Sequence, residues 1–309
     1  MSETARENDA SAAGAAGTIN SPTAEDVLAA LMRALPDAAR HHATDTAIYQ
    51  AFAVAARQAV VALFGPDQHQ TRQFGPFGPI SFPHRSMGAI DTLDLFGLDE
   101  LIIFAFYWAN RGLYSKIADI GANIGLHSLI MSRCGFEVTS FEPDPRHVEI
   151  MQENLKLNGV TAAKIVASAV SDKAGTAEFV RVLGNTTGSH LAGAKHNPYG
   201  KLDRFSVNLV PFADIIAGVD FVKIDAEGHE AVLVTSVQPD QWNGADVMLE
   251  IGSEENASLI FDYVRRSGIN IFTQRNGWSL ARTAADLPTS HKHGSAFITR
   301  RDAVPGMSI

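Results

Sequence analysis

From Tyr114 onward, short apolar runs alternate with longer segments in which apolar residues recur every three or four positions. The short runs are typical of buried strands, and the longer segments are typical of helices that cover a sheet. The pattern predicts strands at 116–120, 137–141, 164–170, 221–224 and 247–251, and helices at 124–134, 145–158, 230–237 and 257–267. This order indicates an α/β fold with a mostly parallel sheet.

Two further parts of this region predict antiparallel pairing. Segments 269–274 and 278–282 flank Asn276-Gly277, a dipeptide typical of tight hairpins, and a last strand follows at 295–299. Between the third and fourth strands lies an excursion with extended segments at 176–183 and 205–210 around a polar, glycine-rich stretch. We expect the excursion to stand apart from the main sheet.

The chain divides into three parts by composition. Residues 1–22 hold few large apolar side chains and are predicted to be a disordered tail. Residues 23–93 are predicted to be a helical N-terminal region, with helices from about Thr23 and at 44–64, followed by a strap rich in proline and glycine. A long apolar helix at 94–111 opens the third part, 94–309, which carries the α/β pattern.

Charge and composition exclude several classes of partner. The 309 residues include 25 lysines and arginines against 34 acids, a net charge of −9 without long basic runs, so nucleic acid is not expected. The longest unbroken apolar run, 101–109, is shorter than the roughly 20 residues of a membrane-spanning helix, so no membrane partner is expected. The single cysteine and the polar start, MSETARENDA, favour the cytoplasm.

A glycine motif, Asp119-Ile-Gly121-Ala-Asn123-Ile-Gly125, lies where the first strand gives way to the first helix. Open α/β sheets bind their ligands at this edge, and glycine lets the backbone approach a ligand closely. The dinucleotide fingerprint requires glycine where this chain has Asn123 and Leu126, and the chain has no Gly-Lys-Ser/Thr ending of a P-loop. The motif therefore predicts a ligand site of another kind.

Glu142 ends the second strand, 21 residues after Gly121. A carboxylate at this place can accept hydrogen bonds from ribose hydroxyls, so the strand, glycine loop and acid together predict a nucleoside site. Alternatively, Asp119 and Glu142 only cap the helices that follow them.

Four blocks in this order, DIGANIGLHS, FEPDP, ASAVSDKAGTAEF and KIDAEGHE, resemble the FkbM family of S-adenosylmethionine-dependent methyltransferases. The resemblance covers about 94–251. It implies a Rossmann-like class I methyltransferase fold, with a seven-stranded sheet and a terminal antiparallel hairpin, and S-adenosylmethionine as cofactor. It also implies roles for cofactor-binding residues: Asp119, Gly121, Asn123 and Gly125 around the methionine part, Glu142 at the ribose, Ser168 and Ala169 near the adenine, and Asp225 near the reacting methyl group.

The segment after the fourth strand, Asp225-Ala-Glu227-Gly-His229-Glu230, concentrates acids and an imidazole at a strand-to-helix turn. Methyl transfer to a hydroxyl is helped by a base, and histidine is the usual base near neutral pH. His229 is the predicted base, with Asp225 or Glu227 positioning it. Alternatively, these residues form the polar first turn of a helix. We predict no obligatory metal, although a hard cation such as magnesium, held by Asp225, Glu227 and Glu250 together with the acceptor, remains an alternative.

Four further residues are predicted to contact the acceptor. His127 lies in the first turn of the helix that follows the glycine motif, and Asn185, Ser189 and His190 share one short polar stretch of the excursion. Loops at such places often cover a substrate. The alternatives are a packing histidine and a solvated connector.

The resemblance to the FkbM family implies an O-methyltransferase that acts on a hydroxyl of a small polar acceptor, a sugar unit or a secondary metabolite of natural product biosynthesis. The helical N-terminal region is expected to cap the acceptor side or to form a homodimer contact. The alternatives are an N- or carboxyl-methyltransferase of the same fold, and a non-catalytic module that binds a nucleoside or a partner protein.

Overall fold

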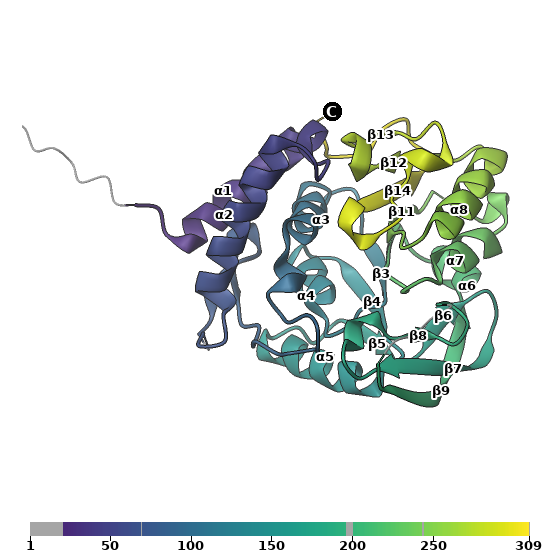
Figure 1. Cartoon of the computed structure of the whole chain (residues 1–309), viewed down its shortest axis with the longest axis horizontal. Coiled ribbons are helices and arrows are strands. Elements are labelled where there is room, and N and C mark those ends of the chain that lie inside the picture. Colours follow the sequence, from purple (N-terminus) through teal and green to yellow (C-terminus); the bar gives the residue numbers. More distant parts are fainter. Residues whose placement is uncertain (1–20, 69, 196–199, 243, 309) are drawn as a thin grey trace, which may run out of the picture.

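The computed structural model describes residues 21–68, 70–195, 200–242 and 244–308. Within these residues, a sheet of eight strands crosses the molecule with helices on both faces (Figure 1). Its spatial order is β13 (Ser279–Leu280), β12 (Asn270–Thr273), β14 (Ser295–Thr299), β11 (Asp246–Glu250), β10 (Phe221–Ile224), β3 (Lys116–Ile120), β4 (Glu137–Phe141) and β5 (Lys164–Val166). The strands from β11 to β5 are parallel, which confirms the predicted α/β fold.

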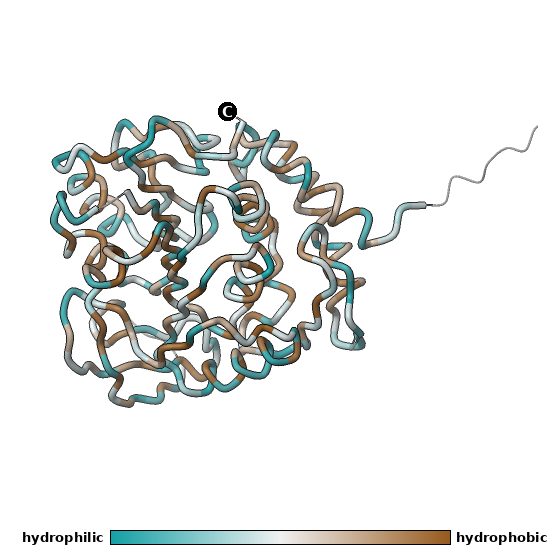
Figure 2. The backbone as a smooth tube through the Cα atoms, turned by 180° about the vertical axis from the view of Figure 1, so that it is seen from behind, coloured by the Kyte–Doolittle hydropathy of each residue, from teal (hydrophilic) through white to brown (hydrophobic). Residues whose placement is uncertain are grey.

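Helices cover the two faces of this sheet as the alternation of side chains requires. Phe221 and Met248 face the layer of α3 (Leu98–Ala109), α4 (Leu126–Arg133) and α5 (Pro145–Leu157). The neighbouring Val222 and Val247 face the layer of α6 (Phe212–Ile216), α7 (Glu230–Ser236) and α8 (Glu254–Ser267). Figure 2 shows apolar positions gathered along the central strands between these layers.

The terminal strands pair antiparallel, as predicted, but with a rearranged order. The last strand, β14, lies between β11 and β12, and the short β13 pairs with β12 at the edge of the sheet. A 3-10 turn at Gln274–Asn276 and a left-handed Gly277 (φ +60°) connect β12 to β13. The family resemblance implied seven strands, whereas the main sheet has eight, and the two-residue β13 is the shortened form of the predicted strand 278–282.

The predicted third strand, 164–170, was wrong as a single element. The chain leaves the main sheet after β5, and β6 (Ala169–Ser171) joins a second sheet with β9 (Leu202–Pro211), β7 (Gly175–Val182) and β8 (His190–Leu191). A backbone hydrogen bond from the Ser168 N–H to the Val166 carbonyl turns the chain between them. The excursion is therefore a small sheet beside the edge of the main one (Figure 1).

The N-terminal region begins with α1 (Ala24–Ala34), capped reciprocally by Thr23 and Asp26, and continues with α2 (Ala47–Phe64). The strap that follows pairs β1 (Arg72–Gln73) with β2 (Pro79–Ile80). The Phe64 and Phe96 rings stack at 4.5 Å, and one continuous core joins this region to α3 and the sheet.

The predicted boundary between 23–93 and 94–309 stays a prediction. The predicted tail falls outside the described residues, apart from 21 and 22.

Short 3-10 helices occur in the connections: η1 (Pro36–His41), η2 (Gly75–Phe77), η3 (Asp94–Phe96), η4 (Thr186–Gly188), η5 (Pro239–Gln241), η6 (Gln274–Asn276), η7 (Ala284–Asp286) and η8 (His291–His293). The predicted helix 94–111 is interrupted at Gly97, between η3 and α3.

Helix α2 has the length and composition of a membrane span, with 18 residues and a mean hydropathy of 1.5. It packs Ala56, Val60 and Phe64 into the protein core. Core helices of globular proteins share these two properties, so length and composition alone are weak evidence for a membrane span.

Candidate active site

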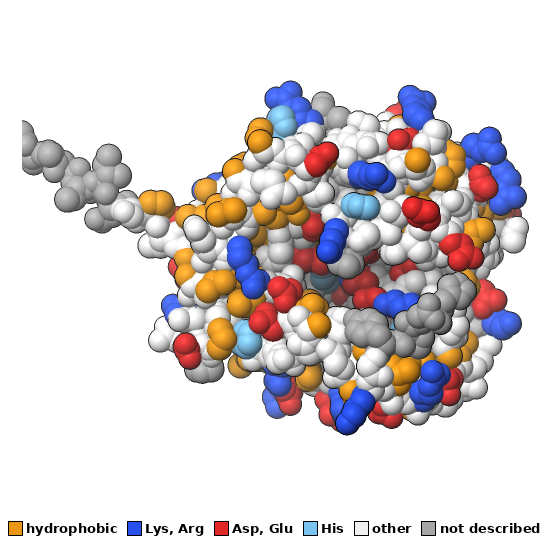
Figure 3. Space-filling model, viewed as in Figure 1, with side chains coloured by type: hydrophobic (Ala, Val, Ile, Leu, Met, Phe, Trp, Pro, Cys, Tyr) orange, Lys and Arg blue, Asp and Glu red, His pale blue; other side chains and the backbone are white. Residues whose placement is uncertain are grey.

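The carboxyl ends of β3, β4, β10 and β11 open into a cleft of about 810 Å³. Helix α3 and the excursion form its other walls. In Figure 3 the hollow on this face of the molecule shows acidic side chains at its base. The cleft lies where open α/β sheets bind their ligands.

The glycine motif forms the wall of the cleft at the end of β3. Gly121 has φ +74°, and a Cβ atom there would lie 1.8 Å from the Asp225 carbonyl oxygen. Gly125 has φ +85°, and a Cβ there would lie 2.5 Å from Met151 Cγ. Only glycine fits both places, because each combines a left-handed backbone with a close contact.

Two polar atoms of this motif have no hydrogen-bond partner within the described residues. The fully buried Asp119 accepts a bond from the Ser128 hydroxyl at 2.6 Å through one oxygen, but its Oδ1 is unpaired. The Asn123 Oδ1 is buried and unpaired as well. Unpaired buried acceptors are costly, so the loop fits a ligand that brings N–H donors, such as the amino group of a methionine moiety.

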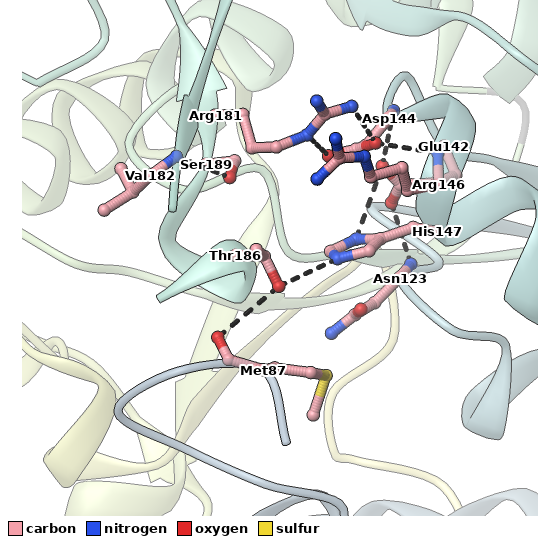
Figure 4. Close-up of polar contacts among 10 residues, drawn as sticks. All are labelled: Met87, Asn123, Glu142, Asp144, Arg146, His147, Arg181, Val182, Thr186 and Ser189. Carbon is pink, nitrogen blue, oxygen red and sulfur yellow. Dashed lines mark hydrogen bonds and ion pairs between the residues drawn. The ribbon is translucent and has the colours of Figure 1, made fainter. Parts of the chain in front are cut away.

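Glu142 connects the glycine loop to the start of α5. One oxygen accepts the Asn123 N–H at 2.8 Å and the other accepts the Asp144 N–H at 2.8 Å (Figure 4). A carboxylate has about four acceptor sites, so two stay available for ribose hydroxyls. Burial raises the pKa of Glu142 to about 8, against the effect of these two amide hydrogen bonds.

An ion pair fastens the excursion to this turn. Arg181 of β7 donates two hydrogen bonds of 2.6 Å to Asp144, which also caps α5 (Figure 4). A third bond of 2.6 Å joins Arg181 to Asp203. Arg181 and Asp144 are both buried. The excursion is thereby held beside Glu142.

The polar loop of the excursion also contacts the N-terminal region. The Thr186 hydroxyl contacts the His147 ring at 3.1 Å and the Met87 carbonyl at 3.5 Å (Figure 4), and the Thr186 N–H donates to the same carbonyl at 2.8 Å. A backbone bridge joins Gly88 to Asn185. Three segments distant in sequence thus meet over the Glu142 side of the cleft.

The turn after β10 supplies the charged side chains of the cleft. Asp225 lies 3.4 Å from the ammonium of the buried Lys223. Glu227, with φ +50°, pairs with Lys195 from the excursion at 2.5 Å. Burial and the charge of Asp225 raise the pKa of Glu227 to about 7, although Lys195 opposes them.

Comparison with known proteins identifies the domain that carries this site. The family model described as the methyltransferase FkbM domain matches residues 119–251. Residues 119–251 form an FkbM methyltransferase domain. The match confirms the predicted family, and with it S-adenosylmethionine as the cofactor.

Several known methyltransferases are similar to the chain. Methyltransferase sdnD of Sordaria araneosa is 27% identical over 162 residues, which span 41% of this chain and 61% of that relative, less than two thirds of its length. Among solved structures, precorrin-6y C5,15-methyltransferase of Geobacter metallireducens has a TM-score of 0.36 at 12% identity, covering 64% of this chain and 86% of that one. The SAH-bound methyltransferase PaMTH1 of Podospora anserina has a TM-score of 0.33 at 11% identity, covering 65% and 79%.

The cleft of the FkbM methyltransferase domain contains most of the predicted site residues, but Asp119 and Gly125 are not among the residues that line it. Side chains or backbone from the following residues line it: Gly121, Asn123, Glu142, Ser168, Ala169, Asn185, Ser189, His190, Asp225, Glu227 and His229. Ser189 and His190 are largely buried, and they bond to the Val182 N–H at 3.1 Å and the Gly188 carbonyl at 3.0 Å. These bonds hold the loop in place as part of the cleft wall.

Two histidines are placed differently from the prediction. His127 does not line the cleft, because its ring lies between Glu100 (2.8 Å) and the Tyr107 hydroxyl (3.0 Å). His229 does line the cleft, but its Nε2 lies 3.0 Å from the Ser171 hydroxyl, and burial lowers its pKa. The role of His229 as base stays a prediction.

Sequence reasoning did not single out Glu100, Lys195 or Lys223, and it named Glu250 only as a ligand of the alternative magnesium site, yet all four line the cleft. A signal existed for two of them. Lys223 interrupts the apolar β10, and Glu250 ends β11 much as Glu142 directly follows β4. Across the described ranges, no three histidine, cysteine or acidic side chains are grouped so that they could hold a metal ion.

Proposed function

We propose that the protein is an S-adenosylmethionine-dependent O-methyltransferase that acts on a hydroxyl of a small polar acceptor, a sugar unit or a secondary metabolite. The single observation that carries the proposal is the cleft itself, which joins the glycine loop and Glu142 to the charged groups around Asp225. Bound S-adenosylmethionine supplies an electrophilic methyl group. The protein positions the acceptor and accepts its proton.

The cofactor side follows from the hydrogen-bonding capacity described above. Asn123 lines the cleft and offers its unpaired acceptor to the amino group of the methionine part, and the fully buried Asp119, at the end of β3, has an unpaired oxygen as well. Glu142 offers its remaining lone pairs to the ribose, while Ser168 and Ala169 line the cleft where β5 leads into β6, next to the adenine. Asp225 lies directly across from Gly121, so it borders the methyl group.

The acceptor side is strongly polar and mostly acidic. The carboxylates of Asp99, Glu100, Asp225, Glu227 and Glu250 line the same cleft as Lys195 and Lys223. An excess of carboxylates repels phosphate, which argues against nucleic acid as the acceptor, and it suits neutral or cationic polyhydroxyl molecules. His229, Asp225 and Glu227 are the proposed catalytic group, and a cytoplasmic location accompanies the proposal.

Calorimetric titration with S-adenosylmethionine and S-adenosylhomocysteine tests the cofactor. Micromolar binding of both is expected, and binding of neither would refute the proposal. Incubation with hydroxylated sugars and radiolabelled S-adenosylmethionine then tests the acceptor, with mass spectrometry to locate the methyl group. Methylation only at nitrogen or at a carboxylate would replace the O-methyltransferase with the corresponding enzyme, and binding without turnover would favour a non-catalytic module.

A further inference from the structure

One wall of the cleft combines ionisable groups from three different elements. Lys223 and Glu250 lie on the face of β10 and β11 that also presents Phe221 and Met248 to α3. Glu100 of α3 lies opposite them in the same cleft. Glu250 lies beyond Asp225 as seen from the glycine loop, because the sheet order is β3, β10, β11 and Asp225 directly follows β10.

The carboxylates around this wall differ in their partners. Most accept hydrogen bonds from the protein: Asp99 from Tyr49 and Gln274, Glu100 from His127, Glu227 from Lys195, and Glu230 from the Gly228 N–H and Asn256. Glu250 has no hydrogen bond or ion pair with any residue that the structure describes. It is therefore the carboxylate of the wall whose full acceptor capacity is open to a ligand.

Lys223 is the second group of this wall with unused hydrogen-bonding capacity. Its side chain is 9% exposed, and its only hydrogen bond within the described chain is the 3.4 Å contact with Asp225. An ammonium has three donors, so a ligand oxygen in the cleft can accept from Lys223. A donor and an acceptor on one wall match the two properties of a hydroxyl group, which accepts and donates.

We propose that Glu250 faces the methyl-transfer position and is the catalytic residue that takes the proton of the acceptor hydroxyl, while Lys223 binds and orients that hydroxyl. The proposal rests on the proposed function. In the step, the acceptor oxygen forms a bond to the methyl carbon and the carbon–sulfur bond breaks. Its electron pair stays on sulfur, which gives neutral S-adenosylhomocysteine, and the hydroxyl proton passes to a Glu250 oxygen.

The charges around Glu250 fit this task. Burial and the neighbouring charges of Asp225, Glu100 and Glu227 hold the pKa of Glu250 well above its ordinary value, although Lys223 opposes them. The sulfonium cation of S-adenosylmethionine adds a positive charge, which favours the ionised carboxylate. The raised pKa makes Glu250 a better proton acceptor than an ordinary carboxylate, the sulfonium charge keeps it ionised before the transfer, and it becomes easier to protonate once the neutral thioether forms.

His229 is the competing base, and its surroundings differ. Its Nε2 is engaged with the Ser171 hydroxyl, which also contacts Asp172 at 3.0 Å. Ser171 belongs to β6 of the small sheet, whereas Glu250 belongs to β11 of the main sheet. The geometry therefore favours Glu250.

The experiment compares two ligands that differ in charge at the transfer position. Sinefungin carries an ammonium-bearing carbon in place of the sulfur and methyl group, whereas S-adenosylhomocysteine is neutral there. The ratio of their dissociation constants, measured by calorimetry for the full chain, reports the charge that faces this position. We expect Glu250→Gln to reduce the preference for sinefungin about tenfold while S-adenosylhomocysteine affinity stays within about twofold.

Glu254→Gln is the matched control, since it removes an equal charge from an exposed position four residues further along. It should leave the ratio unchanged. Glu250→Ala, which removes the charge without adding an amide, should reproduce the change in ratio. If both Glu250 variants keep the wild-type ratio, or lose affinity for the two ligands equally, Glu250 does not face the transfer position and the proposal is overturned.

The turnover number tests whether Glu250 acts as the base or only lies near the reacting atoms. With an acceptor that the wild-type protein methylates, Glu250→Gln should lower kcat about 100- to 10,000-fold, the usual range for loss of a general base. A smaller loss than that of His229→Ala would return the role to His229. A wild-type protein that binds no cofactor or methylates no acceptor would refute the proposed function instead, and this outcome is distinguishable from a failure of Glu250 alone.

Discussion

Replacing Glu142 by glutamine should weaken cofactor binding and loosen the glycine loop at the same time. The two carboxylate oxygens each accept a backbone N–H at 2.8 Å, from Asn123 and from Asp144. Glutamine has one oxygen, so its amide N–H₂ must face one of these donors. Loss of a hydrogen bond to a charged acceptor costs about 1.5–3 kcal/mol.

The same energetic cost applies to the hydrogen bonds from the ribose hydroxyls, because in the variant they meet a neutral amide oxygen in place of a carboxylate. A loss of about 1.5–3 kcal/mol corresponds to a roughly 10- to 150-fold higher Kd for S-adenosylhomocysteine. Calorimetry near pH 8 measures it, with thermal melting as the check on folding. Glu149→Gln, on the exposed side of α5, is the control and should bind as the wild type does.

The pH dependence gives an independent test of the same residue. Glu142 has a pKa of about 8 in the free protein, and donors from the ribose favour its ionised form, so the pKa falls on binding. Below about pH 8 a proton must leave when the cofactor binds, and affinity therefore rises with pH, by at most about tenfold per unit, and levels off above pH 8. Glu142→Gln should abolish this slope. A wild-type affinity that is flat between about pH 6 and 8, together with a Kd for the variant within twofold of wild type, would refute the reasoning.

Three further substitutions test other parts of the site. Arg181→Met leaves the buried carboxylate of Asp144 without its ion-pair partner, so it should lower the free energy of unfolding by about 3–5 kcal/mol in urea titrations. The control is Arg204→Met, which breaks an exposed ion pair and should lower the free energy of unfolding by less than about 1 kcal/mol. Gly121→Ala places a Cβ 1.8 Å from a carbonyl oxygen and should abolish S-adenosylhomocysteine binding in calorimetry, while Gly112→Ala, which meets no atom within 4 Å, should bind normally. His229→Ala should lower turnover more than cofactor affinity if it acts in catalysis, and wild-type turnover across the pH range would make it only the residue that starts α7.

Local patterns were sufficient for the elements of the main sheet. The strands at 116–120, 137–141 and 221–224 have the predicted bounds, since each is a short buried run between polar residues. The position of the glycine motif could also be predicted from the sequence. At Gly121 a left-handed backbone lies in close contact with the end of another strand, and only glycine fits there. The place of Glu142 at the end of β4 followed from the same periodicity.

Tertiary structure alone decided how distant side chains share the cleft. The pairing of Lys195 with Glu227, and the convergence of Glu100, Lys223 and Glu250, depend on segments far apart in the chain. No local pattern indicates that His127 turns toward Glu100 and away from the cleft.

The split of 164–170 has the same origin. Val166 and Ala169 are both apolar residues in one run, and only pairing partners determine that β5 stays in the main sheet while β6 joins β9. The sequence by itself therefore determined which segments are buried strands and helices and where the cofactor loop lies, because those depend on local conformation and periodicity. The tertiary structure decided which charged groups face one another, because contacts and pKa values depend on burial and on neighbours that the chain brings together only when it folds.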